Sequence, residues 1–404
     1  MLKPLFIENL SWRMAEVYEA VTDRILINLA RYFPYVYADN EMRGSFEWQS
    51  RMLAQMGQVN SETVTIIMGS LKGEDEALRE VLEATIMEAL KHEEPALREA
   101  ARRGLLNPPN TIVPELSPNQ MQAFAAYYRQ SVDKLNLVNT TMLQSTAAIY
   151  QQTVSDTAAK ISRTQGILNS ATGEVVTGVR SWNSAMHNAV AGMVETGITG
   201  FYDSAMHHWR PETYVANVLR TTLSNTAREA VWERNEEWGN DIYQVSSHAG
   251  ARPMCYPWQC KLLSRTNYSR DVTDLNGNTI HVHSQDEVES FEYGGGLFGN
   301  NCKHYPMAFV PSLSVIRGEP QPQEENDRLY EETQHQRGLE REVRRRKLDL
   351  ATAKAQGAPA EETDYLKTKV DQARSNLADY CAEHDLPRRK QREYTPIKAE
   401  WPDV

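Results

Sequence analysis

The chain has 404 residues, of which 41% are hydrophobic and 24% are charged, and its formal net charge at pH 7 is −11. This composition is typical of a globular protein with two or three hydrophobic cores, and the acidic balance argues against nucleic-acid binding over the whole surface. The four cysteines are too few for a secreted disulfide framework, and the sequence shows neither a signal peptide nor an apolar run of about 20 residues, so we expect synthesis in a reducing compartment and no membrane anchor.

Helical periodicity dominates the first part of the chain. Apolar residues recur at three- and four-residue steps from Leu10 to Leu29 and predict a first helix with one apolar stripe. Shorter helical patterns follow until Pro108 and Pro109, which restrict the backbone and lack amide hydrogens. We therefore place an N-terminal helical region at residues 1–106.

A second helical region begins sharply at Ser117 and Pro118. Serine caps free amides at a helix start, and proline suits the first helical position. The apolar stripe that follows runs from Met121 to Ile149 and predicts a long helix. We expect residues 117–240 to form an elongated bundle of long helices.

Residues 241–316 contain most of the β-type sequence, three of the four cysteines and four of the ten histidines. Residues 242–246 have the pattern of a strand, and Asn276-Gly277 is a strong hairpin signal because both residues tolerate positive φ angles. Residues 279–283 alternate as the return strand. This segment predicts a compact α+β module with a β-hairpin, and the fold class of the whole chain is mainly α.

The C-terminal region is highly charged. Two helical stretches separated by Gly357-Ala358-Pro359 predict an antiparallel helical hairpin over residues 324–386. Because both stretches are charged nearly all round, we expect the hairpin to project from the body.

The basic tail, residues 387–404, follows the hairpin. We expect it to be extended unless a partner holds it, with few acidic residues nearby. Its bases could contact nucleic-acid phosphates, or they could simply be solvated. They are Arg388, Arg389, Lys390 and Arg392.

The module carries three sequence signatures. It opens with Ser247-x-x-Gly250-Ala251-Arg252-Pro253, including His248, continues through Pro257-Trp258-Gln259, and closes with Gly296-Leu297-x-Gly299-x-Asn301-Cys302-Lys303-His304. This pattern resembles the phage minor capsid protein 2 family, in which similar segments precede an aromatic residue and a "PxxS" tail. Further residues that match are Phe309, Pro311, Ser314 and, upstream, Gly197 to Phe201 and Arg220 to Thr222. The resemblance is strong over residues 190–316.

Two positions depart from the family pattern. Lys303 stands where the family usually has arginine, and Cys260 stands where a small residue such as glycine is expected.

The resemblance implies a structural minor capsid protein of a tailed bacteriophage. Such a protein would be made in the host cytoplasm and reside in the virion, inside the capsid near the portal vertex. It would act in head assembly and in genome packaging or delivery. Its expected partners are the portal protein, the major capsid or scaffold proteins, and packaged DNA through the basic tail.

Four side chains of the module could hold a structural zinc ion. His248, Cys255, Cys302 and His304 are expected to converge because the strands and the hairpin fold the intervening chain back. Mu-type phage head-morphogenesis proteins look distantly similar, with comparable cysteine pairs. The alternative is that these residues are buried packing and hydrogen-bonding groups.

The remaining module residues are assigned structural roles. We single out Arg252, Trp258 and Gln259, and expect Trp258 to anchor the core. His281 and His283 are expected to point to opposite faces of their strand and therefore not to chelate one ion.

We expect the chain not to be an enzyme. The alternative is a metal-dependent or cysteine-dependent enzyme carried in the virion, with Cys302 and His248 as the reactive pair. A filled apolar interior around these residues would favour the structural role, and a concave pocket with carboxylates would favour the enzyme.

Overall fold

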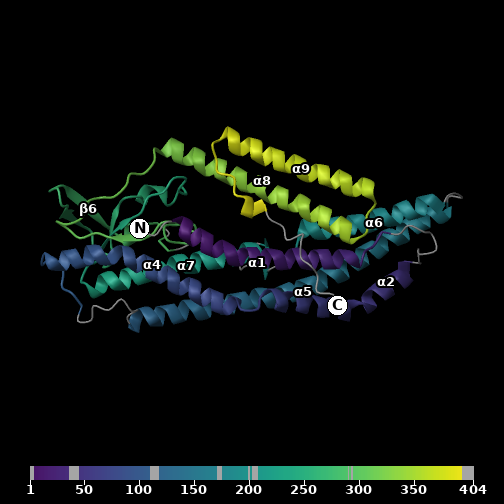
Figure 1. The fold of residues 1–404 in the computed structure, drawn as a ribbon, viewed down its shortest axis with the longest axis horizontal. Coiled ribbons are helices and arrows are strands. Elements are labelled where there is room, and N and C mark those ends of the chain that lie inside the picture. The colour runs from purple at the N-terminus through teal and green to yellow at the C-terminus, as the bar shows by residue number, and fades with distance from the viewer. Residues whose placement is uncertain are drawn as a thin grey trace. The chain divides into compact units, whose positions relative to one another are not determined.

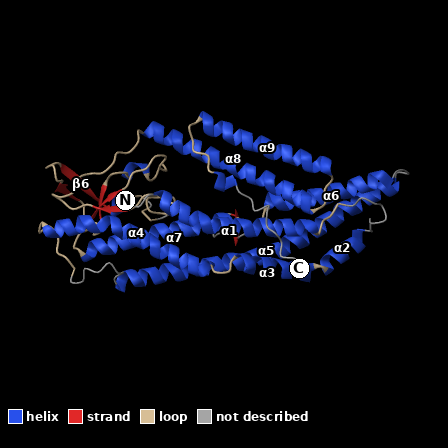
Figure 2. Ribbon diagram, viewed as in Figure 1, coloured by secondary structure: helices blue, strands red, loops and turns tan. Residues whose placement is uncertain are grey.

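The computed structural model describes residues 4–35, 45–109, 118–170, 175–198, 201–202, 208–289, 291–292 and 294–393. The chain is mostly helical with a small five-stranded sheet and a separate two-stranded pair (Figures 1 and 2), so the predicted fold class, mainly α with a small α+β module, is confirmed. The chain divides into two compact units, each built from several separate segments. Unit 1 comprises Met1–Met14, Gly73–Leu135 and Val215–Thr333, and unit 2 comprises Ala15–Lys72, Asn136–Tyr214 and Gln334–Val404.

The helices follow the predicted periodicity closely. The long helix begins at Pro118, as predicted, and ends at Ser170. The predicted cap, Ser117, lies outside the described residues. The helices are α1 (Pro4–Arg31), α2 (Ser45–Ala54), α3 (Met56–Ser70), α4 (Glu74–Arg102), α5 (Pro118–Ser170), α6 (Val175–Thr196), α7 (Pro211–Glu237), α8 (Gln323–Ala355) and α9 (Ala360–Glu383). Within the described residues, no helix is both long and apolar enough to span a membrane.

The sheet of unit 1 has the strand order β5-β6-β4-β3-β7. Only the β4–β6 pair is parallel; the other neighbours are antiparallel. The strands are β3 (Ile242–Val245), β4 (Leu262–Ser264), β5 (Arg270–Thr273), β6 (Thr279–Ser284) and β7 (Pro306–Ala308), and a separate two-stranded pair joins β1 (Phe201–Tyr202) to β2 (His208–Trp209).

The predicted hairpin joins β5 to β6. Gly277 has a φ angle of +84°, which favours glycine because a side chain is strained in this region. The Asp274 carboxylate accepts hydrogen bonds from the backbone N–H groups of Asn276 and Asn278, both at 2.8 Å. The Asn276-Gly277 signal therefore predicted the turn correctly.

The core of the module is an aromatic cluster centred on Trp232 of α7. The Trp232 ring is 2% exposed and meets Phe298 edge-on, with the ring centroids 6.0 Å apart. It also contacts Tyr243 of β3, at 5.8 Å. Helix α7 is therefore an integral part of the module, although the sequence placed it in the preceding bundle.

The prediction that Trp258 anchors this core was wrong. Trp258 lies in the short 3-10 helix η2 (Tyr256–Trp258), is only partly buried and packs against the edge of the cluster. The fully enclosed aromatic position is taken by Trp232, which is 2% exposed.

Helix α4 is tied to the sheet through β7. The Glu93 carboxylate accepts a hydrogen bond from the Ala308 N–H at 2.7 Å, and Glu94 pairs with Arg234 of α7 through two hydrogen bonds of 2.8 and 2.9 Å. The N-terminal helical segment thus contributes directly to unit 1.

The contacts of the module continue beyond residue 316, into the first turns of α8. Asn326 is fully buried; its side chain accepts from the Ala251 N–H at 2.7 Å and donates to the Ala251 carbonyl at 2.8 Å. The Tyr256 hydroxyl donates to the Gln321 carbonyl at 2.6 Å.

Helices α8 and α9 form the predicted hairpin (Figure 1), but it does not project freely. Within unit 2, Gln356 at its turn donates to the carbonyls of Phe33 and Met186, at 2.8 and 3.2 Å, and Tyr35 donates to Glu362 at 2.6 Å. The expectation of helices charged all round was wrong because both helices bury apolar stripes. The buried apolar residues are Val343, Leu348, Ala351, Ala353, Leu366, Val370, Ala373 and Leu377.

The basic tail is less isolated than expected. Arg388 forms two hydrogen bonds with Glu393, at 2.6 and 2.7 Å, and Arg392 lies 3.4 Å from Glu340. The expectation of few nearby acids was wrong, because these two buried glutamates pair with the basic residues. Residues 394–404 of the predicted tail lie outside the described residues.

The burial of Trp232 gives a first prediction. Trp232→Ala should lower the free energy of unfolding by about 3–5 kcal/mol, because truncating a buried tryptophan removes its packing and leaves a cavity. Urea denaturation followed by near-UV circular dichroism measures the change. The matched variant Trp258→Ala should cost clearly less, and an equal or larger cost at Trp258 would contradict this assignment of the core.

The buried Glu93 gives a pH prediction. Burial raises the pKa of Glu93, against the opposing hydrogen bond from Ala308. The folded state then keeps the carboxyl proton to higher pH than the unfolded state. The contribution of protonated Glu93 to stability is therefore fully present below the unfolded pKa and is lost as pH rises through the folded pKa. Glu93→Gln keeps an acceptor oxygen for Ala308 but cannot ionise. It should be more stable than the wild type at pH 7, with the difference vanishing near pH 4.

Glu94→Gln is the control of opposite sign. Burial alone would raise the pKa of Glu94, but its hydrogen bonds to Arg234 and Arg98 outweigh burial and lower it. This variant should therefore be less stable than the wild type at pH 7. Thermal unfolding measured from pH 4 to pH 8 separates the two, and a Glu93→Gln profile parallel to the wild type would refute the buried titration.

A candidate metal centre in the Cys/His module

Two loop segments on either side of β3 carry the cysteines. Cys255 lies at the start of η2, where its N–H donates to the Arg252 carbonyl at 2.9 Å. Cys302 and His304 end the closing loop, residues 294–304. The opening segment is joined to β3 by the Cys260 N–H, which donates to the Val245 carbonyl at 3.0 Å, and the closing loop by the Tyr305 N–H, which donates to the Ser246 hydroxyl at 3.1 Å. This shared strand brings the two segments together.

Three of the four predicted side chains meet in the core. The Sγ atoms of Cys255 and Cys302 are 4.0 Å apart, and Cys302 Sγ lies 3.4 Å from His304 Nδ1. The donor atoms of all three residues lie within 4.8 Å of one another. The residues are 1%, 3% and 4% exposed, respectively, so the group is enclosed by the module.

His248 is adjacent to this group but is not one of the three. Its ring packs against the His304 ring at a tilt of 34°, with the centroids 4.3 Å apart, and its Nδ1 lies 3.0 Å from the Ala249 carbonyl. Burial, followed by the neighbouring His304, lowers the pKa of His248 to about 4. The imidazole is therefore neutral at pH 7 and flanks the group as a packing partner.

Each of the two thiols shifts the pKa of the other. A hydrogen bond from Cys255 stabilises the Cys302 thiolate and holds the pKa of Cys302 well below its ordinary value, with His304 contributing in the same direction. The same hydrogen bond, and then burial, raises the pKa of Cys255. Besides Cys255, Cys302 Sγ also lies beside the His304 imidazole, 3.4 Å from Nδ1.

The three donors suit three of the four ligand positions of a tetrahedral zinc ion. Zn–S bonds of about 2.3 Å and Zn–N bonds of about 2.0 Å set the ligand atoms roughly 3.5–3.8 Å apart, close to the observed separations of 4.0 and 3.4 Å. The other ring nitrogen of His304, Nε2, is buried without a hydrogen-bond partner. The polar partner of the buried His304 imidazole is thus Cys302 Sγ. Because thiol hydrogen bonds are weak, a bound cation would offset the cost of burying this imidazole.

Other predicted module residues brace these loops. Arg252 donates to the Asn300 carbonyl at 2.9 Å, and the Gln259 side chain accepts from the His248 N–H at 2.7 Å. Cys260 has a φ angle of +62°, a region that favours glycine. This conformation explains why a small residue is expected there, and Cys260 does not join the sulfur pair.

Two arginines of α7 form hydrogen bonds with the closing loop. Arg220 donates to the Asn301 side chain at 2.8 Å, and Arg228 donates to the Phe298 carbonyl at 2.9 Å. Arg228 also pairs with Glu292 at 3.0 Å and lies over the Trp232 ring. Sequence reasoning missed Arg228; the available signal was an arginine four residues before a tryptophan on one helix face.

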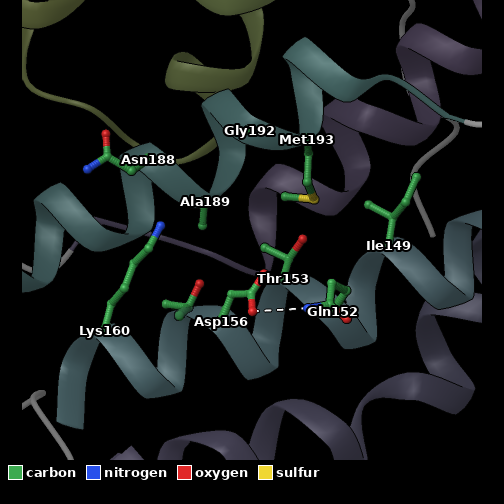
Figure 3. A pocket seen from close by; sticks show the side chains of 10 residues that line it. Ile149, Gln152, Thr153, Asp156, Lys160, Asn188, Ala189, Gly192 and Met193 are labelled. Atoms are coloured by element: carbon green, nitrogen blue, oxygen red, sulfur yellow. Dashed lines mark hydrogen bonds between the residues drawn. The ribbon is translucent and has the colours of Figure 1, made fainter. Parts of the chain in front are cut away.

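A separate pocket of about 240 Å³ lies between α5 and α6 in unit 2 (Figure 3). Its polar lining includes Asp156, which accepts from Gln152 at 3.0 Å, and Lys160. None of the cysteines and histidines singled out from the sequence contributes to it, and its lining offers no thiol or imidazole.

Comparisons with known proteins agree with the sequence motifs. The family described as phage minor capsid protein 2 matches residues 2–382. A structural protein of Lactococcus phage LL-H is 24% identical over 302 residues, which cover 74% of this chain and 75% of the relative. No solved structure matches the chain.

Proposed function

Because the chain belongs to the phage minor capsid protein 2 family, we propose that it is a structural component inside the head of a tailed phage, near the portal vertex. There it would act in head assembly and in packaging or delivery of the genome. The similar protein of Lactococcus phage LL-H is itself named a structural protein, which supports the general role.

The observation that carries this proposal is the filled interior around the Cys/His group. Cys255 and Cys302 are buried in one cluster with Trp232, Tyr243, Leu297 and Phe298. A nucleophilic thiol must reach its substrate, whereas a structural centre is closed. The buried arrangement therefore favours a rigid structural module.

The rival function is a cysteine-dependent enzyme carried in the virion. The lowered pKa of Cys302 beside His304 favours it, since a thiolate is the nucleophilic form. The 3% exposure of Cys302 opposes it. Labelling the native protein with a thiol reagent distinguishes the two, because a catalytic Cys302 would react rapidly and a structural one would not.

We further propose that Cys255, Cys302 and His304 hold a structural zinc ion. When bound, the ion would neutralise the sulfurs and cross-link the opening segment to the closing loop. His248 would pack against His304 and would not bind the ion.

The proposed partners are the portal protein, the major capsid or scaffold proteins, and packaged DNA. Of the basic residues considered for DNA contact, Lys390 is exposed, whereas Arg388 and Arg392 already pair with glutamates. Any DNA contact would therefore depend chiefly on the exposed Lys390.

Localisation tests the proposed role directly. Cryo-electron microscopy of procapsids and mature heads, compared with particles made without this protein, should show extra density inside the head at the portal vertex. Density confined to the tail or the outer capsid surface would contradict the proposed location, and normal assembly and infectivity without the protein would contradict the role.

The zinc proposal predicts about one zinc ion per chain after dialysis, measured by elemental analysis of full-length protein purified under reducing conditions. Cys302→Ser should lose this zinc and lower the thermal unfolding temperature, because ligand removal uncouples metal binding from folding. Cys381→Ser is the matched control, since Cys381 is buried in α9, within unit 2, and is not among the three clustered donors. A wild-type protein that contains no zinc and is equally stable with and without chelator would instead establish simple packing.

A further inference from the structure

A second cluster of metal-ligand side chains lies on β6. The expectation that His281 and His283 point to opposite faces was wrong, because residues two apart in a strand lie on the same face. Their ring centroids are 4.7 Å apart and the rings are nearly perpendicular, at 83°. Two imidazoles are therefore presented together, with the buried Val282 between them facing the core.

Glu287 completes the cluster from the short 3-10 helix η3 (Gln285–Glu287), directly after β6. One ring nitrogen of each histidine and a carboxylate oxygen of Glu287 lie within 4.8 Å of one another. The carboxylate is fixed in place: it accepts from the Ser284 N–H at 3.0 Å and from the Ser269 hydroxyl, and it lies 2.7 Å from His283 Nδ1. These hydrogen bonds, Ser269 first, lower the pKa of Glu287 to about 2, so the group is anionic at neutral pH.

A second carboxylate orients the other imidazole. Asp271 of β5 is the cross-strand partner of His281, and its Oδ1 lies 2.7 Å from His281 Nδ1. A carboxylate that accepts one ring N–H fixes the tautomer and leaves the lone pair of the other nitrogen free for a metal. The strand register therefore supplies an outer partner for the ligand.

The cluster is open to solvent, unlike the cysteine group. The side chains of His281, His283 and Glu287 are 50%, 24% and 40% exposed, respectively. The two histidines lie on β6 and Glu287 on η3, and both elements belong to unit 1. An ion could reach them without local unfolding.

We propose that His281, His283 and Glu287 form a solvent-accessible site for a divalent transition metal, with zinc as the ion that its two imidazoles and one carboxylate suit best. Two histidines and a glutamate are a known type of zinc ligand set, and three protein ligands leave a position for water. Asp271 is a positioning residue that acts through His281. This site is independent of the proposed function and of the cysteine centre.

The competing interpretation is a pair of surface hydrogen bonds between a histidine and a carboxylate. The chain contains such a pair elsewhere: His92 lies 3.0 Å from Glu88 on α4, in unit 1. This pair has one imidazole and no second one beside it among the described residues, so it provides a matched control for metal binding.

Calorimetric titration of the purified full-length protein with ZnCl₂, and with NiCl₂ as a probe, tests the proposal. The wild type should bind one ion per chain beyond any that survives dialysis. His281→Asn and His283→Asn should each weaken this binding at least about tenfold, and Asp271→Asn should weaken it by roughly tenfold through lost orientation. His92→Asn and Cys302→Ser should leave it unchanged.

Trp258 offers a second readout. Its ring meets His283 edge-on, with the centroids 5.6 Å apart, so Ni²⁺ in the site should quench its fluorescence, and Trp258→Phe should remove that part of the quenching. The proposal is overturned if the double variant His281→Asn/His283→Asn binds zinc as well as the wild type. It is also overturned if Cys302→Ser alone abolishes the additional binding.

Discussion

The buried guanidinium of Arg228 is the interaction on which the module depends most. Burial lowers its pKa, and the Glu292 carboxylate opposes that shift. The same side chain donates to the Phe298 carbonyl and lies against the Trp232 and Phe298 rings. One cation therefore fixes both ends of the loop segment 292–298 on α7. Cys302 and His304 lie a few residues after Phe298 in the same loop, so the contacts of Arg228 also restrain their positions.

Local signals in the sequence predicted local structure well. The Asn276-Gly277 turn, the helix start at Pro118 and the break before Ala360 each depend on backbone preferences of a few residues, and each is present. Long-range packing was harder to predict. Trp258 carries the family motif, but Trp232 holds the enclosed position, because burial is decided by which residues meet across α7 and the sheet. Glu340 and Arg392 are 52 residues apart, so no local pattern revealed their pairing.

Candidate metal ligands show the same division between local and tertiary information. The sequence motifs marked His248, Cys255, Cys302 and His304 as ligands. Only the fold shows that His248 packs against His304, whereas the donor atoms of the other three residues converge. For His281 and His283, a correct use of the strand period would have placed both imidazoles on one face. The strand period could not have predicted the role of Glu287. Its carboxylate is positioned by the turn into η3 and by a hydrogen bond from Ser269, which lies in another segment.

The interlocking of segments also determines how the C-terminal hairpin can be studied. Asn326 satisfies both backbone groups of Ala251, which lies four residues before Cys255. A truncation at residue 324 would leave this buried N–H and carbonyl unpaired, at a cost of about 1–3 kcal/mol for each group. Loss of head incorporation after such a truncation could then reflect damage to the module and not the absence of a partner contact. Substitutions on the exposed face of α9, such as at Tyr365, which is 59% exposed, leave Asn326 in place and therefore test the hairpin alone.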